Sequence, residues 1–503
     1  MLVLSAASIA QAKRPGPSQP SRELRAVIDA ADSLPFEYRA DIQLGIGEAD
    51  AIHNVKFETS MLERLFRDAS TATYPLKQRD ITGDSEKRSR RLGTAFGQNL
   101  DALSVRLRVI RRLLKVNPAA AQDFFTELRL DVPSASCKSP MVYDVADYYS
   151  TAAQVLDSGA TPKEPHRDEL VQSMQRLTAN VSSSVELVPL LALISGRDLT
   201  DEQMQTLLPD VTVILRSVAV NNREFTAMEG DHGLTRAVET ITSTHKSPAA
   251  DELLAAYRSF VVRGARSPRC SETKISPQSI AQSFNDVWRN AASESETRLL
   301  TEQDLASEGV GEPTSTEAMP DFSEFNGLLK RLLMLRRMGP EAPEAQGWES
   351  DVSTFLDRVH AVPDSPTCHV CVFHKKADLF MTFLDFTPKS SLKQRIVADY
   401  VQFLANDAAK DEAPLEWLFR VKLLLNQART PSQESLDRIE GLKANGRILT
   451  MLPSDAAAEI RAAIRSSNNP ALMQLLVADS ILKRNYELPP YMAHTPERAT
   501  EQK

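Results

Sequence analysis

The chain has 503 residues, enough for two or more domains with sizeable hydrophobic cores. Hydrophobic residues make up 42% and charged residues 25%, a balance that excludes an intrinsically disordered chain. The formal net charge of −8 excludes a global positive field that would attract nucleic acid. No stretch reaches the roughly 18 apolar residues of a membrane span. We therefore expect no nucleic-acid partner and no transmembrane segment.

The N-terminus reads MLVLSAASIAQA over Met1–Ala12, a short apolar run that ends in Ala10-Gln11-Ala12. Small residues at these positions are what signal peptidase accepts, although the usual basic start is missing. We predict that residues 1–12 are a signal-peptide remnant and that residues 13–20 are flexible. The protein is then periplasmic or secreted; the alternative is a cytoplasmic protein with an apolar start.

Helix punctuation recurs along the chain. Only 18 glycines occur, and this scarcity favours helices over tight turns. A Ser, Thr or Asn followed by Pro is typical of a helix start. The first residue caps the helix, and proline lacks only an amide N–H that would be unpaired at this position. These pairs are Asn117-Pro118, Ser139-Pro140, Ser247-Pro248, Ser276-Pro277, Thr430-Pro431 and Asn469-Pro470. Thr200 and Gln203 read as a capping box. We expect helices to begin at each.

Apolar residues follow these starts at helical spacing. The stripes are Val142, Val145, Ala146, Tyr149, Ala153 and Leu156; Leu103, Leu107, Ile110 and Leu114; and Trp417, Val421, Leu424 and Leu425. β-branched runs are short, at Leu208–Val220 and Cys368–Phe373. We predict an all-α fold, an irregular array of antiparallel helical hairpins that is α-solenoid-like or a multi-helix bundle.

The polar stretch Thr301–Met319 has almost no bulky apolar residue and is the best candidate for a linker. It predicts two helical bodies, an N-terminal domain at 21–300 and a C-terminal domain at 320–485. Residues 486–503, with Pro489-Pro490, are expected to form a flexible tail.

Two passages carry a resemblance. Ser33–Ala49 (SLPFEYRADIQLGIGEA) and Phe373–Ala428, which includes HKKADLF and EWLFRVKLLL, resemble a functionally uncharacterised group of exported all-helical bacterial proteins. The resemblance rests on pattern over about a third of the chain. It implies a helical, exported protein and no particular site residues.

The four cysteines are Cys137, Cys270, Cys368 and Cys371. In an exported protein they are candidates for two disulfides, and four cysteines allow three connectivities. In the cytoplasm they would be reduced. The number of cysteines does not decide between these states.

Cys368, Cys371 and His374 lie within seven residues, and His360 precedes them. A Cys-x2-Cys knuckle commonly supplies half of a tetrahedral zinc site, so zinc bound by these four residues is one hypothesis. A thiol-redox pair is another, although the flanks show no βαβ pattern. Covalent haem is excluded because Val372 stands where Cys-x-x-Cys-His needs histidine. The simplest interpretation is that these cysteines form disulfides or are buried thiols.

Catalytic patterns are missing from the sequence: it contains no Gly-x-Ser-x-Gly elbow and no His-Glu-x-x-His pair. Two basic clusters, Lys87–Arg91 and Arg106–Lys115, lack interleaved aromatic residues and are expected to pair with acidic neighbours. We predict a non-enzymatic interaction or structural protein of the bacterial cell envelope, without a cofactor and with a protein or peptide partner. The alternative is a zinc-binding or thiol-redox protein, or an unrecognised enzyme, centred on Cys368, Cys371 and His374.

Overall fold

The structure is a computed structural model that describes residues 20–81, 88–159, 166–229, 232–270, 276–291, 299–306, 309, 322–338, 346–365, 368–387, 390–407, 413–429 and 456–482. The predicted signal remnant at 1–12 and tail at 486–503 lie outside these residues, as does most of the predicted linker at 301–319.

Within the described residues the chain is mostly helical and has almost no strand, which confirms the predicted all-α class. The first helices are α1 (Arg22–Ala31), α2 (Phe36–Glu48), α3 (Val55–Asp68), α4 (Arg88–Phe96), α5 (Ala102–Val116), α6 (Pro118–Glu127) and α7 (Ala146–Gly159). Next come α8 (His166–Ala179), α9 (Leu187–Ser195), α10 (Asp201–Ser217), α11 (Asn222–Glu229), α12 (Gly233–Thr244), α13 (Pro248–Arg266) and α14 (Pro277–Ala291). The last are α15 (Ser323–Met338), α16 (Trp348–Ala361), α17 (His369–Phe386), α18 (Ser391–Asn406), α20 (Pro414–Gln427), α22 (Ala457–Ser466) and α23 (Pro470–Ile481).

The predicted caps start these helices. Asn117, Ser247 and Asn469 each accept a hydrogen bond from the backbone N–H three residues later, and proline is the first helical residue in each case. Thr200 and Gln203 form the predicted capping box of α10. The start predicted at Thr430-Pro431 lies outside the described residues.

The start predicted at Ser139-Pro140 is wrong. Met141–Tyr143 is strand β2, which pairs antiparallel with β1 (Gln78–Asp80), and the helix begins only at Ala146. The Ile81 amide donates to the Pro140 carbonyl and the Asp144 amide donates to the Lys77 carbonyl. These long-range hydrogen bonds satisfy the backbone in extended form, so the local helix signal does not prevail.

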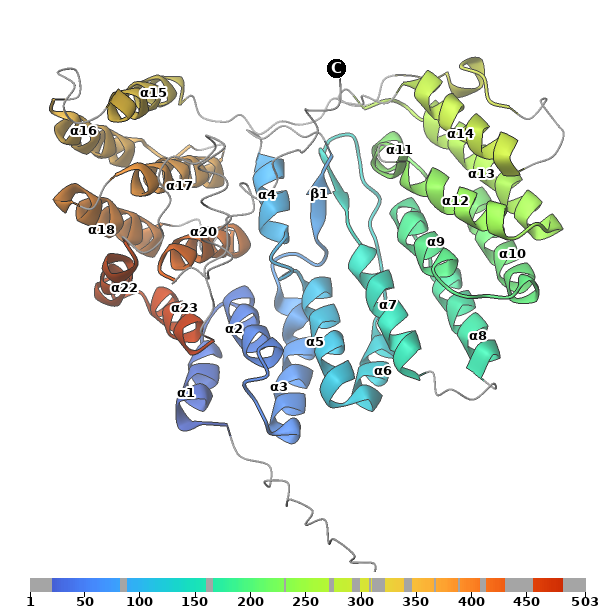
Figure 1. Ribbon diagram of the computed structural model, residues 1–503, viewed down its shortest axis with the longest axis horizontal. Coiled ribbons are helices and arrows are strands. Elements are labelled where there is room, and N and C mark those ends of the chain that lie inside the picture. The colour runs from blue at the N-terminus through green and yellow to red at the C-terminus, as the bar shows by residue number, and fades with distance from the viewer. Residues whose placement is uncertain are drawn as a thin grey trace, which may run out of the picture.

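Helix contacts follow an order that differs from the chain order (Figure 1). Starting from α15, successive contacts run through α16, α17, α18, α22 and α23, then to α1, α2, α3, α5, α7, α9, α12 and α14. The two ends of the described chain therefore meet in the middle, at α1 and α23, while α14 and α15 lie at opposite sides of the molecule. Helices of the two predicted bodies pack against each other. The division at 301–319 and the solenoid-like arrangement of hairpins stay predictions.

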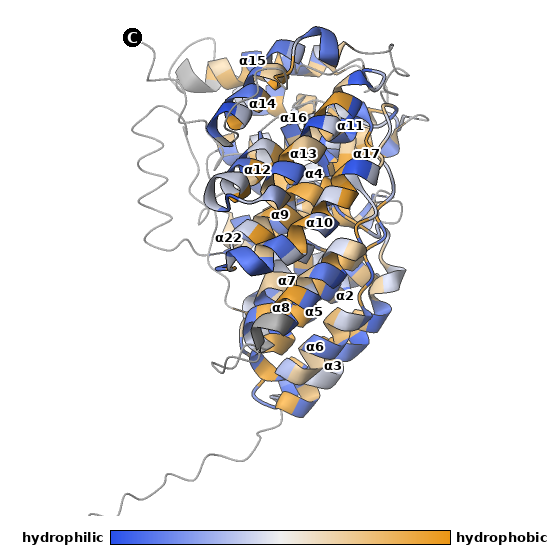
Figure 2. Cartoon of the chain, turned by 90° about the vertical axis from the view of Figure 1, so that its right-hand side faces the viewer, coloured by the Kyte–Doolittle hydropathy of each residue, from blue (hydrophilic) through white to orange (hydrophobic). Residues whose placement is uncertain are grey.

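The junction between the chain ends is deeply buried. Most helices, such as α5 and α10, carry hydrophobic residues on one side and polar residues on the other (Figure 2). In contrast, α2 is buried on all sides, including its polar residues Glu37, Asp41 and Gln43. Tyr38 packs against Trp417 of α20, with ring centroids 4.9 Å apart.

Candidate functional site

All four cysteines are paired. Cys137 bonds to Cys270, and Cys368 bonds to Cys371, which decides the connectivity that the sequence left open. Cys137–Cys270 joins the loop before β2 to the loop after α13. The two residues that begin α11 hold it in place: Arg223 donates to the Cys137 carbonyl, and Asn222 accepts from the Cys270 amide at 3.0 Å.

The Cys368–Cys371 disulfide lies at the N-terminus of α17. Cys368 is the N-cap residue, and its Sγ accepts a 3.2 Å hydrogen bond from the Cys371 backbone N–H. Cys371 belongs to the first turn and is fully buried, whereas 6% of Cys368 is exposed. The bridge thus closes the first turn of an 18-residue helix.

His374 lies one turn further along α17 and is completely buried. Its Nδ1 accepts a 2.9 Å hydrogen bond from Arg420 Nε, so the ring proton is on Nε2, which lies 3.3 Å from Glu416 Oε1. Burial lowers the pKa of His374 well below its usual value, and the positive charges of Arg420 and Arg91 lower it further. The imidazole is therefore neutral.

The charges around His374 come from three helices. Asp378 of α17 lies 2.7 Å from Arg420 of α20 and 2.8 Å from Arg91 of α4. Burial opposes ionisation of Asp378, but these two guanidinium groups hold its pKa below the usual value. Burial raises the pKa of Glu416, whose Oε2 lies 3.5 Å from Arg88. Arg88 and Arg91, which belong to the basic cluster noted in the sequence, thus supply ion pairs that join α4 to α17 and α20.

The four predicted metal ligands do not form a ligand set here. Cys368 and Cys371 are bonded to each other, and both ring nitrogens of His374 have partners. His360 lies on α16, with Nε2 3.7 Å from Asp399 and its ring against Phe380. Among the described residues, no three His, Cys, Asp or Glu side chains are placed to hold a metal ion. Zinc binding stays a prediction that requires the disulfide to be reduced.

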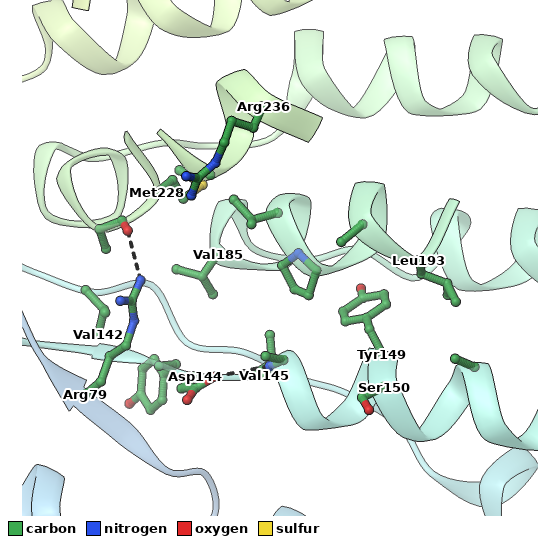
Figure 3. Close-up of a pocket in the computed structure, with 18 residues that line it drawn as sticks. Arg79, Val142, Asp144, Val145, Tyr149, Ser150, Val185, Leu193, Met228 and Arg236 are labelled. Atoms are coloured by element: carbon green, nitrogen blue, oxygen red, sulfur yellow. Dashed lines mark hydrogen bonds between the residues drawn. The ribbon is translucent and has the colours of Figure 1, made fainter. Parts of the chain in front are cut away.

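A pocket of about 670 Å³ lies beside β2, α7, α9 and α12 (Figure 3). This is a suitable volume for a small ligand or a few amino-acid side chains. Its walls are mostly apolar and include Val142, Tyr149, Val185, Leu193 and Met228. The sequence predicts that Val142 and Tyr149 share one helical stripe, but Val142 lies in strand β2 and only Tyr149 lies on α7. The sequence did not indicate the pocket, because apolar residues that line a pocket and those that fill a core follow the same spacing.

The pocket is positively charged at one end. Figure 3 shows the guanidinium groups of Arg79 and Arg236 toward one end of the pocket and Tyr149 and Leu193 toward the other. Arg79 donates a 2.8 Å hydrogen bond to the Ala227 carbonyl. No carboxylate among the described residues pairs with Arg236. Asp144, the acidic residue of the lining, lies 3.7 Å from Lys77.

Among the residues that the structure describes, strand β2 pairs with β1 along one edge only, and its backbone borders this pocket. The sheet has two strands within the described residues, and Arg79 lies opposite Val142. The bonds from Ile81 to Pro140 and from Asp144 to Lys77 set the hydrogen-bonded positions of the ladder. Because such positions alternate, the N–H and C=O of Tyr143 point away from β1. Val142–Val145 all line the pocket, so this stretch of backbone borders it.

A buried polar group fixes the apolar end. The Tyr149 hydroxyl donates a 2.9 Å hydrogen bond to Glu186, whose other oxygen accepts from the amides of Ser182 and Ser183. Burial raises the pKa of Glu186, and it raises the pKa of Tyr149 well above its usual value. The tyrosine ring is thus held in one orientation as a pocket wall.

Comparisons with protein-family models, with curated proteins and with solved structures found no match to the chain. None of the helices in the described residues combines the length and the apolarity needed to cross a bilayer.

Proposed function

We propose that this chain is a helical interaction protein of the bacterial cell envelope, whose primary role is the non-enzymatic binding of an apolar peptide segment of a protein partner. The pocket beside β2 is its binding site. The observation that carries the proposal is the combination of apolar walls with two arginines at one end of the pocket (Figure 3).

The charge at the pocket selects the ligand. A peptide that ends in the pocket carries a carboxylate, which the planar guanidinium of Arg236 binds through two parallel hydrogen bonds. Its last apolar side chains then lie toward Tyr149 and Leu193, away from water. The chain as a whole has a net charge of −8, so this local excess of positive charge contrasts with the average of the chain.

The edge of β2 that does not pair with β1 favours a peptide over another apolar acid. An extended peptide adds to a sheet edge by main-chain hydrogen bonds, while pockets beside the edge accept alternate side chains. The N–H and C=O of Tyr143 supply one such pair of hydrogen bonds next to the apolar walls.

Peptides displayed with free carboxyl termini, selected on the purified protein, test this function. We expect the selected sequences to end in apolar residues, and we expect Arg236→Gln to weaken their binding at least tenfold in calorimetric titration. Arg289→Gln is the matched control, because Arg289 is an exposed arginine paired with Asp286 outside the pocket. Amidation of the peptide terminus should weaken binding as much as Arg236→Gln does.

Two outcomes would contradict the proposal. Equal peptide affinities in the Arg236→Gln and Arg289→Gln variants would show that peptides bind elsewhere. Binding of dodecanoate at the pocket without any binding of free-carboxyl peptides would identify a small amphipathic acid as the ligand instead.

The envelope location is supported by the cysteines, because disulfides persist in oxidising compartments and are rare in the cytosol. Protein isolated from its native host and denatured under acidic conditions should contain no more than one free thiol. Four free thiols in that material would place the protein in a reducing compartment.

A further inference from the structure

The two disulfides differ in what they can contribute to stability. Cys137–Cys270 links residues 133 positions apart, whereas Cys368–Cys371 links residues three positions apart. A disulfide stabilises a fold mainly by restricting the unfolded chain, and the effect grows with the length of the closed loop. The first turn of α17 already brings Cys368 and Cys371 together. Stability therefore gives little reason for the local bridge.

The position of Cys368 favours a thiolate once the bridge is opened. Its Sγ lies at the N-terminus of an 18-residue helix and accepts a hydrogen bond from the Cys371 N–H. The helix dipole is positive at this end, and a sulfur that accepts a backbone N–H is further stabilised as an anion. Both effects lower the pKa of a cysteine thiol.

The position of Cys371 favours its role as the cysteine that leaves the disulfide. It is fully buried, and His374 follows it by three residues on the same face of α17. The ionic groups linked to His374 are three arginines, Arg88, Arg91 and Arg420, against two carboxylates, Glu416 and Asp378. This local excess of positive charge lies about one helical turn from Cys371 and opposes the cost that complete burial imposes on a thiolate there.

We propose that Cys368 and Cys371 form a redox-active pair that exchanges electrons with dithiols of a protein substrate. A substrate thiolate attacks Cys368 Sγ, forms a mixed disulfide and expels Cys371 as a thiolate. The second substrate thiol, as its thiolate, then attacks the substrate sulfur of the mixed disulfide and releases Cys368. The substrate is oxidised to a disulfide, and its two electrons and two protons end on the two cysteines.

The direction of attack follows from exposure. Cys368 is 6% exposed and Cys371 is completely enclosed, so Cys368 is the less enclosed of the two sulfurs; the attack is therefore assigned to Cys368, and Cys371 is the leaving group. The activity is separate from the peptide pocket, which lies beside β2, α7, α9 and α12.

Incubation of the full chain in glutathione redox buffers tests the proposal. After acid quenching and alkylation, mass spectrometry reports the state of each cysteine. We expect Cys368–Cys371 to become reduced while Cys137–Cys270 remains oxidised and the helical circular dichroism is unchanged. Reduction of both pairs only when the protein unfolds would overturn the proposal.

Single variants separate the roles of the two cysteines. Reduced Cys371→Ser should form a mixed disulfide with oxidised glutathione at Cys368 at least tenfold faster than reduced Cys368→Ser forms one at Cys371. Both variants lack the Cys368–Cys371 disulfide, so its loss affects the stability of the two proteins equally. Equal rates in the two folded variants would contradict the assigned direction and the redox role.

Discussion

The Lys422 ammonium donates a 2.5 Å hydrogen bond to Asp41, 381 residues earlier in the chain. This contact joins α20 to α2. The sequence predicts α2 in the N-terminal domain and α20 in the C-terminal domain. Asp41 is buried, and about a quarter of the Lys422 side chain is exposed. The pair therefore reports directly on whether the chain ends pack together.

A double-mutant cycle tests this junction. Asp41→Asn and Lys422→Gln should each lower the free energy of unfolding by about 1–3 kcal/mol, because each removes one charge of a partly buried ion pair. The coupling energy from urea denaturation should be about 1 kcal/mol or more. The exposed pair Asp286–Arg289 is the control, with an expected coupling below about 0.5 kcal/mol. Zero coupling between Asp41 and Lys422 would show that α2 and α20 do not meet.

Gly264 lies within α13 where Phe225 of α11 approaches closely. A Cβ at this position would overlap the Phe225 ring, so Gly264→Ala should destabilise the protein by about 1–3 kcal/mol. Gly327→Ala is the matched control, because Gly327 is also helical and a Cβ there meets no atom within 4 Å. That variant should gain about 0.5–1 kcal/mol, since alanine loses less entropy in a helix. Thermal unfolding of both proteins decides whether the helix packing is as described.

Loss of each disulfide should have very different effects. Cys137→Ser/Cys270→Ser should lower the free energy of unfolding by about 2–5 kcal/mol, because the bridge closes a long loop. Cys368→Ser/Cys371→Ser should lower it by less than about 1–2 kcal/mol, since the closed loop is a single helical turn. Denaturant unfolding of the two double variants gives the comparison. Equal losses would assign a structural role to both bridges.

Asp385 near the end of α17 should make stability depend on pH. Burial raises the pKa of Asp385 to about 7, although the charge of Lys393 opposes the rise. The unfolded side chain ionises near its ordinary pKa of about 3.9. Between these two values the folded protein keeps a proton that the unfolded chain has lost, so stability falls as pH rises from about 4 to about 7.

Asp385→Asn removes this dependence. A pKa rise of this size corresponds to at most about 4 kcal/mol in the free energy of unfolding. Solvent access at a half-buried residue reduces this energy. We therefore expect Asp385→Asn to raise the free energy of unfolding by about 1–2 kcal/mol at pH 8. At pH 4 the variant and the parent protein should be equally stable. Melting temperatures measured across this range provide the check. A difference that is constant with pH would rule out titration of Asp385 as its cause.

Several features of the fold could be predicted from short sequence patterns. Asn117, Ser247 and Asn469 cap helices through hydrogen bonds to an amide three residues away, so local chemistry suffices to place these starts. Ser139 shows the limit of this reasoning. The same Ser-Pro pattern precedes a strand there, because the partners of residues 140–144 lie at residues 77–81.

The candidate sites could be predicted only in part. Cys368, Cys371 and His374 could be predicted as a candidate site because they lie close together in the chain. The partners of His374 are Glu416 and Arg420, 42 and 46 residues away, and no spacing rule connects them. No sequence pattern indicated the pocket, because Arg79 and Arg236 come from segments that meet only in the folded protein.

The sequence by itself determined the all-helical class, several helix starts and the presence of an even set of cysteines, because these depend on backbone hydrogen bonds and residue types within a few positions. The tertiary structure decided which cysteines pair, how the chain ends join and where two arginines border an apolar pocket. Those outcomes depend on which apolar faces bury one another, and many pairings of similar faces satisfy the same helical spacing.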